Sequence, residues 1–141
     1  MYAGAHINKY KSVNVQTASP GQLLVALYET AIRYARQAAG SIRAGNVVAK
    51  GREIQRVADL ITELASTLNR DVAPELCDNL EQLYFYMGER LSESNATMTP
   101  EPVEEVARLM ETLKEAWIQA VDQVEGRRAQ STEMANAASN P

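Results

Sequence analysis

The side chains that could perform catalysis are few in this sequence. His6 is the only histidine and Cys77 the only cysteine. A di-iron centre in a helical bundle takes a Glu-x-x-His motif from each of two helices, which one histidine cannot supply. Nucleophilic catalysis by Cys77 needs a base beside it, usually histidine, and none is near in the sequence. Adjacent acids such as Glu104 and Glu105 could transfer protons, but they also fit a solvated helix face. We therefore expect a protein that is not an enzyme.

The motifs of common cofactors are also missing. The sequence contains no Cys-x-x-Cys-His for covalent haem, no Gly-x-x-x-x-Gly-Lys for nucleotides and no Gly-x-Gly-x-x-Gly for dinucleotides. We expect no catalytic residue, no cofactor and no metal site.

Length and charge narrow the class of protein further. A chain of 141 residues is long enough for one domain with its own core. Its net charge of −4 gives no basic field for nucleic acid. The N-terminus lacks the basic and apolar stretches of a signal peptide, and no apolar run reaches the roughly 20 residues that span a bilayer. We expect a cytoplasmic protein that binds no nucleic acid and does not insert into membranes.

Four segments carry apolar residues at steps of three or four, which places those residues on one face of an α-helix. The predicted fold is therefore all-α, an antiparallel four-helix bundle, since short connections favour antiparallel neighbours. The four apolar series are Leu24, Tyr28, Ala31, Ala35, Ala38 and Ile42; Ile54, Val57, Ile61, Leu64 and Leu68; Cys77, Leu80, Tyr84, Met87 and Leu91; and Val103, Val106, Met110, Leu113, Trp117, Ala120 and Val124.

Helix-breaking residues separate the series. The breaks fall at Gly45 with Asn46, at 69–74 and at 94–102, where Thr99 is a candidate N-cap. Gly126 is predicted to end the fourth helix. We therefore expect one domain over residues 1–141, made of an N-terminal arm (1–19), a helical bundle (20–126) and a disordered polar tail (127–141) whose composition cannot offset the entropy of ordering.

The first predicted helix is apolar over roughly 200° of its circumference, more than a helix with one buried face needs. Leu23, Leu27 and Tyr34 lie on one flank of its series, and Val25 and Ile32 on the other. Either this helix is central in the bundle, or half of its apolar surface is available to a partner. The sequence leaves both alternatives open.

Two other features suggest a partner surface. Tyr84, Phe85 and Tyr86 follow one another in the third helix and must face different directions, so one of them should lie near solvent or a partner. The arm carries Ile7 and Tyr10 outside any apolar series. Such an arm could pack on the bundle over an apolar groove and leave it when a partner arrives.

A set of short motifs resembles the FliS family of flagellin export chaperones. The resemblance runs from about Tyr10 to Trp117. Where that family usually has Leu-Tyr-Asp-Gly-Ala and Ala-Asn, this sequence has Leu-Tyr-Glu-Thr-Ala at 27–31 and Ser-Asn at 94–95. The motifs are Tyr10, Thr17-Ala18-Ser19-Pro20, Leu27-Tyr28, Leu83-Tyr84, Tyr86-Met87, Arg90-Leu91 and Trp117.

The resemblance implies a cytoplasmic bundle that binds the disordered C-terminal segment of flagellin in apolar grooves and prevents premature polymerisation before type III export. It also implies that Ile7 and Tyr10 contact this client or gate its access. It leaves open whether an export-gate component or an anti-sigma factor binds as well. Helical-wheel positions add further candidates for partner binding, with core packing as the alternative for each: Leu23, Leu27, Tyr34, Phe85 and Tyr86.

An alternative function remains open at this point. A helical adaptor or scaffold could use the same apolar flank for homodimerisation. Light scattering distinguishes an export chaperone from a homodimeric adaptor, because an export chaperone should gain mass only when its client is added.

Overall fold

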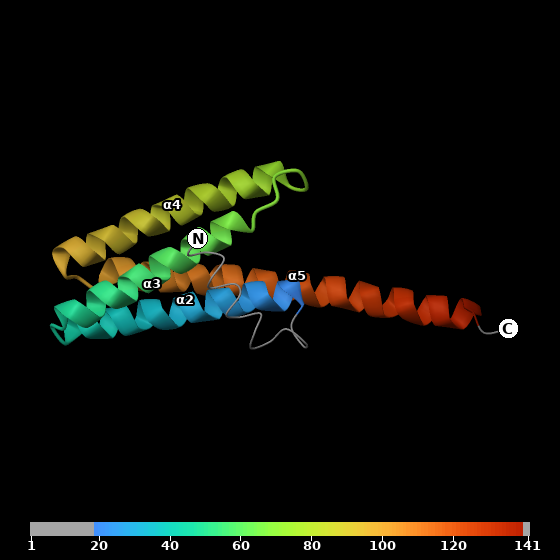
Figure 1. The fold of residues 1–141 in the computed structure, drawn as a ribbon, viewed down its shortest axis with the longest axis horizontal. Coiled ribbons are helices and arrows are strands. Elements are labelled where there is room, and N and C mark those ends of the chain that lie inside the picture. The colour runs from blue at the N-terminus through green and yellow to red at the C-terminus, as the bar shows by residue number, and fades with distance from the viewer. Residues whose placement is uncertain (1–18, 140–141) are drawn as a thin grey trace.

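The computed structural model describes residues 19–139, and this part of the chain forms four α-helices (Figure 1). Consecutive helices run antiparallel, and α5 returns to pack against α2, which closes a four-helix bundle. The predicted all-α bundle is confirmed, whereas the arm that was expected to pack on it lies outside the described residues. The helices are α2 (Pro20–Arg43), α3 (Val47–Ser66), α4 (Pro74–Thr97) and α5 (Glu101–Ser139).

The start of α2 follows from a capping box. The backbone N–H of Gln22 donates to the Ser19 hydroxyl at 3.2 Å, and the Ser19 N–H donates to the Gln22 side chain at 2.9 Å. Pro20 occupies the first turn, where its missing N–H costs nothing. Asn46 caps α3 with its side chain, which accepts from the Ala49 N–H at 3.1 Å. Local sequence therefore fixes where the first two helices begin.

The turn between α2 and α3 depends on Gly45, whose φ of 71° lies in the left-handed region. Gly45→Ala should destabilise the protein by about 1–2 kcal/mol, because a Cβ is strained there even in open space. Gly51→Ala, in the interior of α3 with nothing near its Cβ, should stabilise by about 0.5–1 kcal/mol. Urea unfolding measures both, and shifts of the same sign would contradict this account of the turn.

Helix α2 is central in the bundle, which decides between the two alternatives for its broad apolar stripe. Tyr34, on one flank, lies beneath Arg56 of α3. On the other flank Ile32 is buried, and Val25 is half-buried and lines a pocket shared with α5. Small residues between these flanks, Ala31 and Ala35 among them, are fully buried and allow the neighbouring helices to approach closely. Most of the extra apolar surface is therefore used by the chain's own helices.

A cap from a neighbouring helix holds the start of α5. The hydroxyl of Ser94, buried in α4, accepts from the backbone N–H of Val103 at 2.9 Å. The prediction that Thr99 caps this helix is wrong, since α5 begins at Glu101 and the Thr99 hydroxyl pairs with that of Thr97 at 2.7 Å. The serine at position 94, one of the two departures from the family motif, thus satisfies one of the orphan N–H groups of α5.

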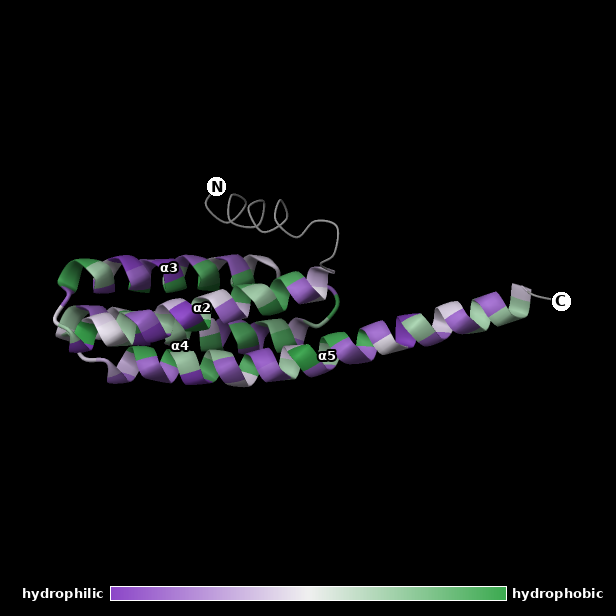
Figure 2. Ribbon diagram, turned by 90° about the horizontal axis from the view of Figure 1, so that it is seen from below, coloured by the Kyte–Doolittle hydropathy of each residue, from purple (hydrophilic) through white to green (hydrophobic). Residues whose placement is uncertain are grey.

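Helix α5 continues past the ends of α2, α3 and α4 (Figure 2). The predicted helix end at Gly126 is wrong, because the helix runs to Ser139. A glycine costs only about 1 kcal/mol in a helix, and the residues after it include several strong helix formers. All side chains from 126 to 139 are exposed.

Disorder of this tail in the free protein stays a prediction. Only the helix's own hydrogen bonds hold residues 127–139, and an unsupported helix of this length is marginal in water. Trypsin should therefore cut after Arg127 and Arg128 before it cuts the bundle, leaving a fragment that melts at the temperature of the full chain. Cleavage of the bundle while the tail is intact would contradict this prediction.

Candidate partner-binding surface

An apolar pocket of about 280 Å³ lies at the end of the bundle where α2 begins and α3 ends. We call it the end pocket. Its walls come from α2, the α3–α4 connection, α4 and α5, so four parts of the chain must fold together to form it. It is lined by Leu24, Thr67, Leu68, Asn69, Val72, Ala73, Leu76, Cys77, Leu80, Tyr84 and Trp117.

Polar contacts hold the connection between α3 and α4 that forms one wall of the end pocket. The Asp71 N–H donates to the Asn69 side chain at 3.1 Å, which makes a short turn. Arg70 then forms ion pairs with Asp78 and Glu81 on α4. These contacts fix the loop backbone beside the pocket.

The rim of the end pocket exposes apolar side chains. Val72 in the connection is 77% exposed and Leu76 in the first turn of α4 is 48% exposed. Neither belongs to the apolar series of the sequence, so periodicity could not identify them. The available signal was the presence of two apolar residues close to a helix start that have no place on its buried face.

Two tyrosines and a tryptophan form a polar cluster beside the end pocket, with Tyr84 and Trp117 in the pocket lining. The Tyr28 and Tyr84 hydroxyls form a buried hydrogen bond between α2 and α4. Burial raises the pKa of both groups, and for Tyr28 the Tyr84 hydroxyl and the Trp117 indole N–H reduce the effect. That indole N–H is buried, yet it forms no hydrogen bond of ordinary geometry in residues 19–139. Tyr84 and Trp117 connect this cluster to the pocket lining.

The three consecutive aromatic residues of α4 have three different environments, as their succession predicted. Tyr84 is buried, whereas Phe85 is 71% exposed on the outer face of the helix. The Tyr86 hydroxyl donates to Glu105 of α5 at 2.7 Å, and Arg90 donates to the same carboxylate at 2.6 Å. The Tyr86 hydrogen bond, supported by Arg90, holds the pKa of Glu105 below its usual value. Of the three, Phe85 is the side chain that is free to contact a partner.

The predicted residues of α2 are less accessible. Leu27 is buried in the bundle core, while Leu23 and Tyr34 are half-buried. The structure does not gather the predicted set, since Tyr34 faces α3 and Phe85 lies on the outer side of α4. Burial assigns Leu27 to the core. Ile7 and Tyr10 lie outside the described residues.

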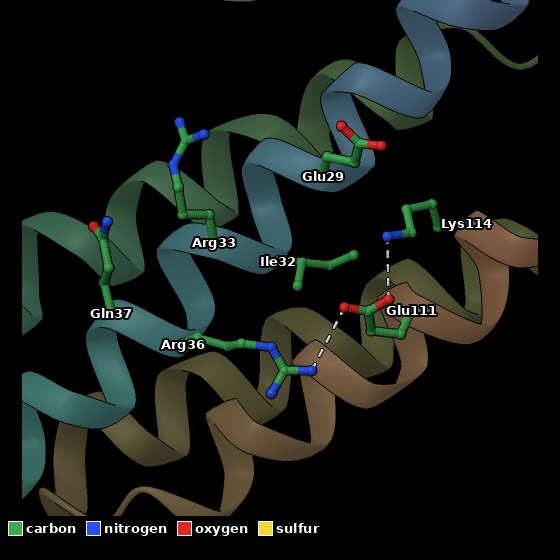
Figure 3. A pocket seen from close by; sticks show the side chains of 7 residues that line it. All are labelled: Glu29, Ile32, Arg33, Arg36, Gln37, Glu111 and Lys114. Atoms are coloured by element: carbon green, nitrogen blue, oxygen red, sulfur yellow. Dashed lines mark ion pairs between the residues drawn. The ribbon is translucent and has the colours of Figure 1, made fainter.

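A second, more polar hollow of about 530 Å³ lies between α2 and α5 (Figure 3). Arg36 and Lys114 both approach Glu111, at 3.6 and 3.3 Å. Ile32 is its one apolar side chain, and charged and polar side chains form the rest of its lining. Figure 3 also shows Arg33 directed away from α5.

The described helices form a small helical bundle with an apolar pocket at one end and an exposed aromatic side chain on α4. None of the helices in residues 19–139 is long and apolar enough to cross a membrane.

Comparison with known proteins defines the family. A family model described as "Flagellar protein FliS" matches residues 3–124. The chain is 33% identical to the flagellar secretion chaperone FliS of Salmonella typhimurium, over 84% of this chain and 92% of that protein. It is 31% identical to FliS of Bacillus subtilis over 79% and 83% of the two chains, and 28% identical to FliS of Vibrio cholerae over 80% and 86%. The chain belongs to the FliS family of flagellar secretion chaperones, which confirms the resemblance found in its motifs.

Proposed function

We propose that this protein is a cytoplasmic export chaperone for flagellin. It binds the disordered C-terminal segment of flagellin in apolar grooves and prevents premature polymerisation before type III export. The observation that carries the proposal is the end pocket with its exposed rim at Val72 and Leu76, in a chain whose relatives are flagellar secretion chaperones.

The physical basis is helix-in-groove recognition. A disordered segment that folds on binding lays the apolar face of an amphipathic helix against the chaperone, with side chains as anchors in pockets. Ordering the segment costs about 2–5 kcal/mol, and burial of about 1,000–3,000 Å² is the usual scale of compensation. The end pocket alone is too small to bury an area of that size. The bound segment therefore also covers surface beyond the pocket, and Phe85 and Leu23 are the proposed contacts. Tyr86 and Tyr34 would join them only by giving up their contacts with Glu105 and with the two arginines above the Tyr34 ring.

The arm is proposed to act at the same end of the bundle. Helix α2 begins at Pro20, and Leu24 in its next turn lines the end pocket, so the described chain begins at the end of the bundle that carries the pocket. Ile7 and Tyr10 either contact the bound client or gate its access. A double Ile7→Ala, Tyr10→Ala variant that binds flagellin with unchanged affinity would rule out both roles.

A seeded polymerisation assay tests the function itself. Flagellin monomers are mixed with short filament seeds, and growth is followed by light scattering with increasing amounts of this protein. Growth should stop near one copy per flagellin, because each bound copy sequesters one C-terminal segment. Growth that continues with the protein in excess would contradict the proposal.

Light scattering of the protein alone distinguishes the export chaperone from the alternative, an adaptor that forms homodimers. The proposal predicts a mass that is independent of concentration and increases only with flagellin. A dimer that forms without flagellin, and that a charge in the end pocket dissociates, would favour homodimerisation through this surface.

A further inference from the structure

We propose that a face of α2 and α3 centred on Tyr34 binds an acidic segment of a partner protein. We call it the arginine face, formed by Arg33, Tyr34, Arg52 and Arg56. The inference goes beyond the binding of flagellin in the end pocket and does not depend on it.

Two guanidinium groups from different helices share one aromatic ring. The guanidinium carbon of Arg33 in α2 lies 5.4 Å from the centre of the Tyr34 ring, and that of Arg56 in α3 lies 5.5 Å from it. Arg52 stands one turn before Arg56, which places it on the same side of α3. The half-buried Tyr34 ring thus organises cations from both helices on one surface.

These arginines differ from others of the bundle in having no acidic partner. Arg36, Arg43, Arg70 and Arg90 each form an ion pair with a carboxylate. In the described part of the chain, Arg33, Arg52 and Arg56 form none. All three side chains are exposed. The arginine face therefore holds positive charge that the bundle itself does not neutralise.

The chemistry of this face fits carboxylates. A guanidinium group that packs on an aromatic ring keeps its in-plane N–H donors available, and their fork matches a carboxylate bidentately. Two like charges held at the same ring repel each other, and an anion between them relieves that repulsion. Arginine is also weakly hydrated, so little solvation is lost when such a pair forms.

The charge distribution favours an acidic protein segment over nucleic acid. Helix α2 carries three arginines and one glutamate, and α3 carries three basic and three acidic residues. In contrast, α4 carries one arginine and five acidic residues, and α5 four basic and eight acidic residues. A short acidic segment can contact the arginine face and avoid α4 and α5. A long polyanion would also meet the acidic side of a protein whose net charge is −4.

The test is fluorescence anisotropy with a labelled glutamate–alanine peptide of about 16 residues, or roughly four helical turns, at low ionic strength. Arg33→Gln with Arg56→Gln should weaken binding about tenfold or more. Arg127→Gln with Arg128→Gln is the matched control, because it removes the same charge from the exposed end of α5, and it should change affinity less than about twofold. Tyr34→Phe should retain the wild-type affinity, whereas Tyr34→Ala should weaken binding several-fold.

Three results would overturn the proposal. These results are no binding of the peptide by the wild-type protein, equal loss of affinity in the two double variants, and tighter binding of an oligothymidylate of similar length than of the peptide. Equal losses of affinity would mean that only the net charge of the protein determines binding. Tighter binding of oligothymidylate would assign the arginine face to nucleic acid. Thermal melting of each variant confirms that the bundle is intact.

Discussion

Leu76→Asp should weaken binding of the C-terminal segment of flagellin by about tenfold or more, the scale of an interface hot spot. Leu76 lines the end pocket and is only half-buried in the free protein. The substitution removes an apolar contact and places a carboxylate where a bound apolar side chain would have to desolvate it. The free energy of unfolding should change far less than the affinity, because the new charge can reach water when no client is bound.

The matched control is Val48→Asp, which introduces the same charge at the opposite end of the bundle. Val48 is 77% exposed in the first turn of α3 and lines none of the pockets described above. The affinity of the Val48→Asp variant for flagellin should stay within about twofold of wild type, because a lone surface charge contributes little to binding. Equal losses in the two variants would place the binding surface elsewhere.

The second large effect is on stability and concerns the buried hydroxyl pair. Tyr28→Phe leaves the Tyr84 hydroxyl without its partner in the core, which should cost about 1–3 kcal/mol, and Tyr84→Phe should cost a similar amount. The double variant removes both polar groups together, so its loss of stability should be smaller than the sum of the losses in the two single variants. Urea unfolding of the four proteins gives the coupling energy. Additive losses would show that the hydrogen bond contributes nothing specific.

The same pair predicts a dependence on alkaline pH. Burial raises the pKa of Tyr28 and Tyr84 above the value in the unfolded chain, about 10. Below that pH both states keep these protons, and the stabilisation is complete. As pH rises above it, the unfolded chain releases protons that the folded chain retains, so the free energy of unfolding falls. The double phenylalanine variant should lose stability less steeply over the same range.

Local sequence determines where α2 and α3 begin and most of the core. The capping box at Ser19 and the cap at Asn46 are formed by residues close in sequence, so their geometry follows from the chain itself. The apolar series likewise gave buried positions in all four helices, from Tyr28 to Met110.

Features that depend on tertiary structure could not be predicted in this way. The cap on α5 comes from Ser94 on a different helix. The broad stripe of α2 was ambiguous because periodicity shows that a face is apolar but not whether the chain itself covers it. The end pocket was missed because Leu24, Leu76 and Trp117 become neighbours only after the bundle closes.

The most direct test of the account is calorimetric titration of this protein with the C-terminal segment of flagellin from the same organism, at several temperatures. The account predicts one-to-one binding with a negative heat-capacity change, the mark of apolar burial, and loss of most of that affinity in Leu76→Asp. Comparison with a chain lacking residues 1–15 measures the contribution of the arm. Absence of binding to the full chain would contradict the central claim that this bundle is a chaperone for flagellin.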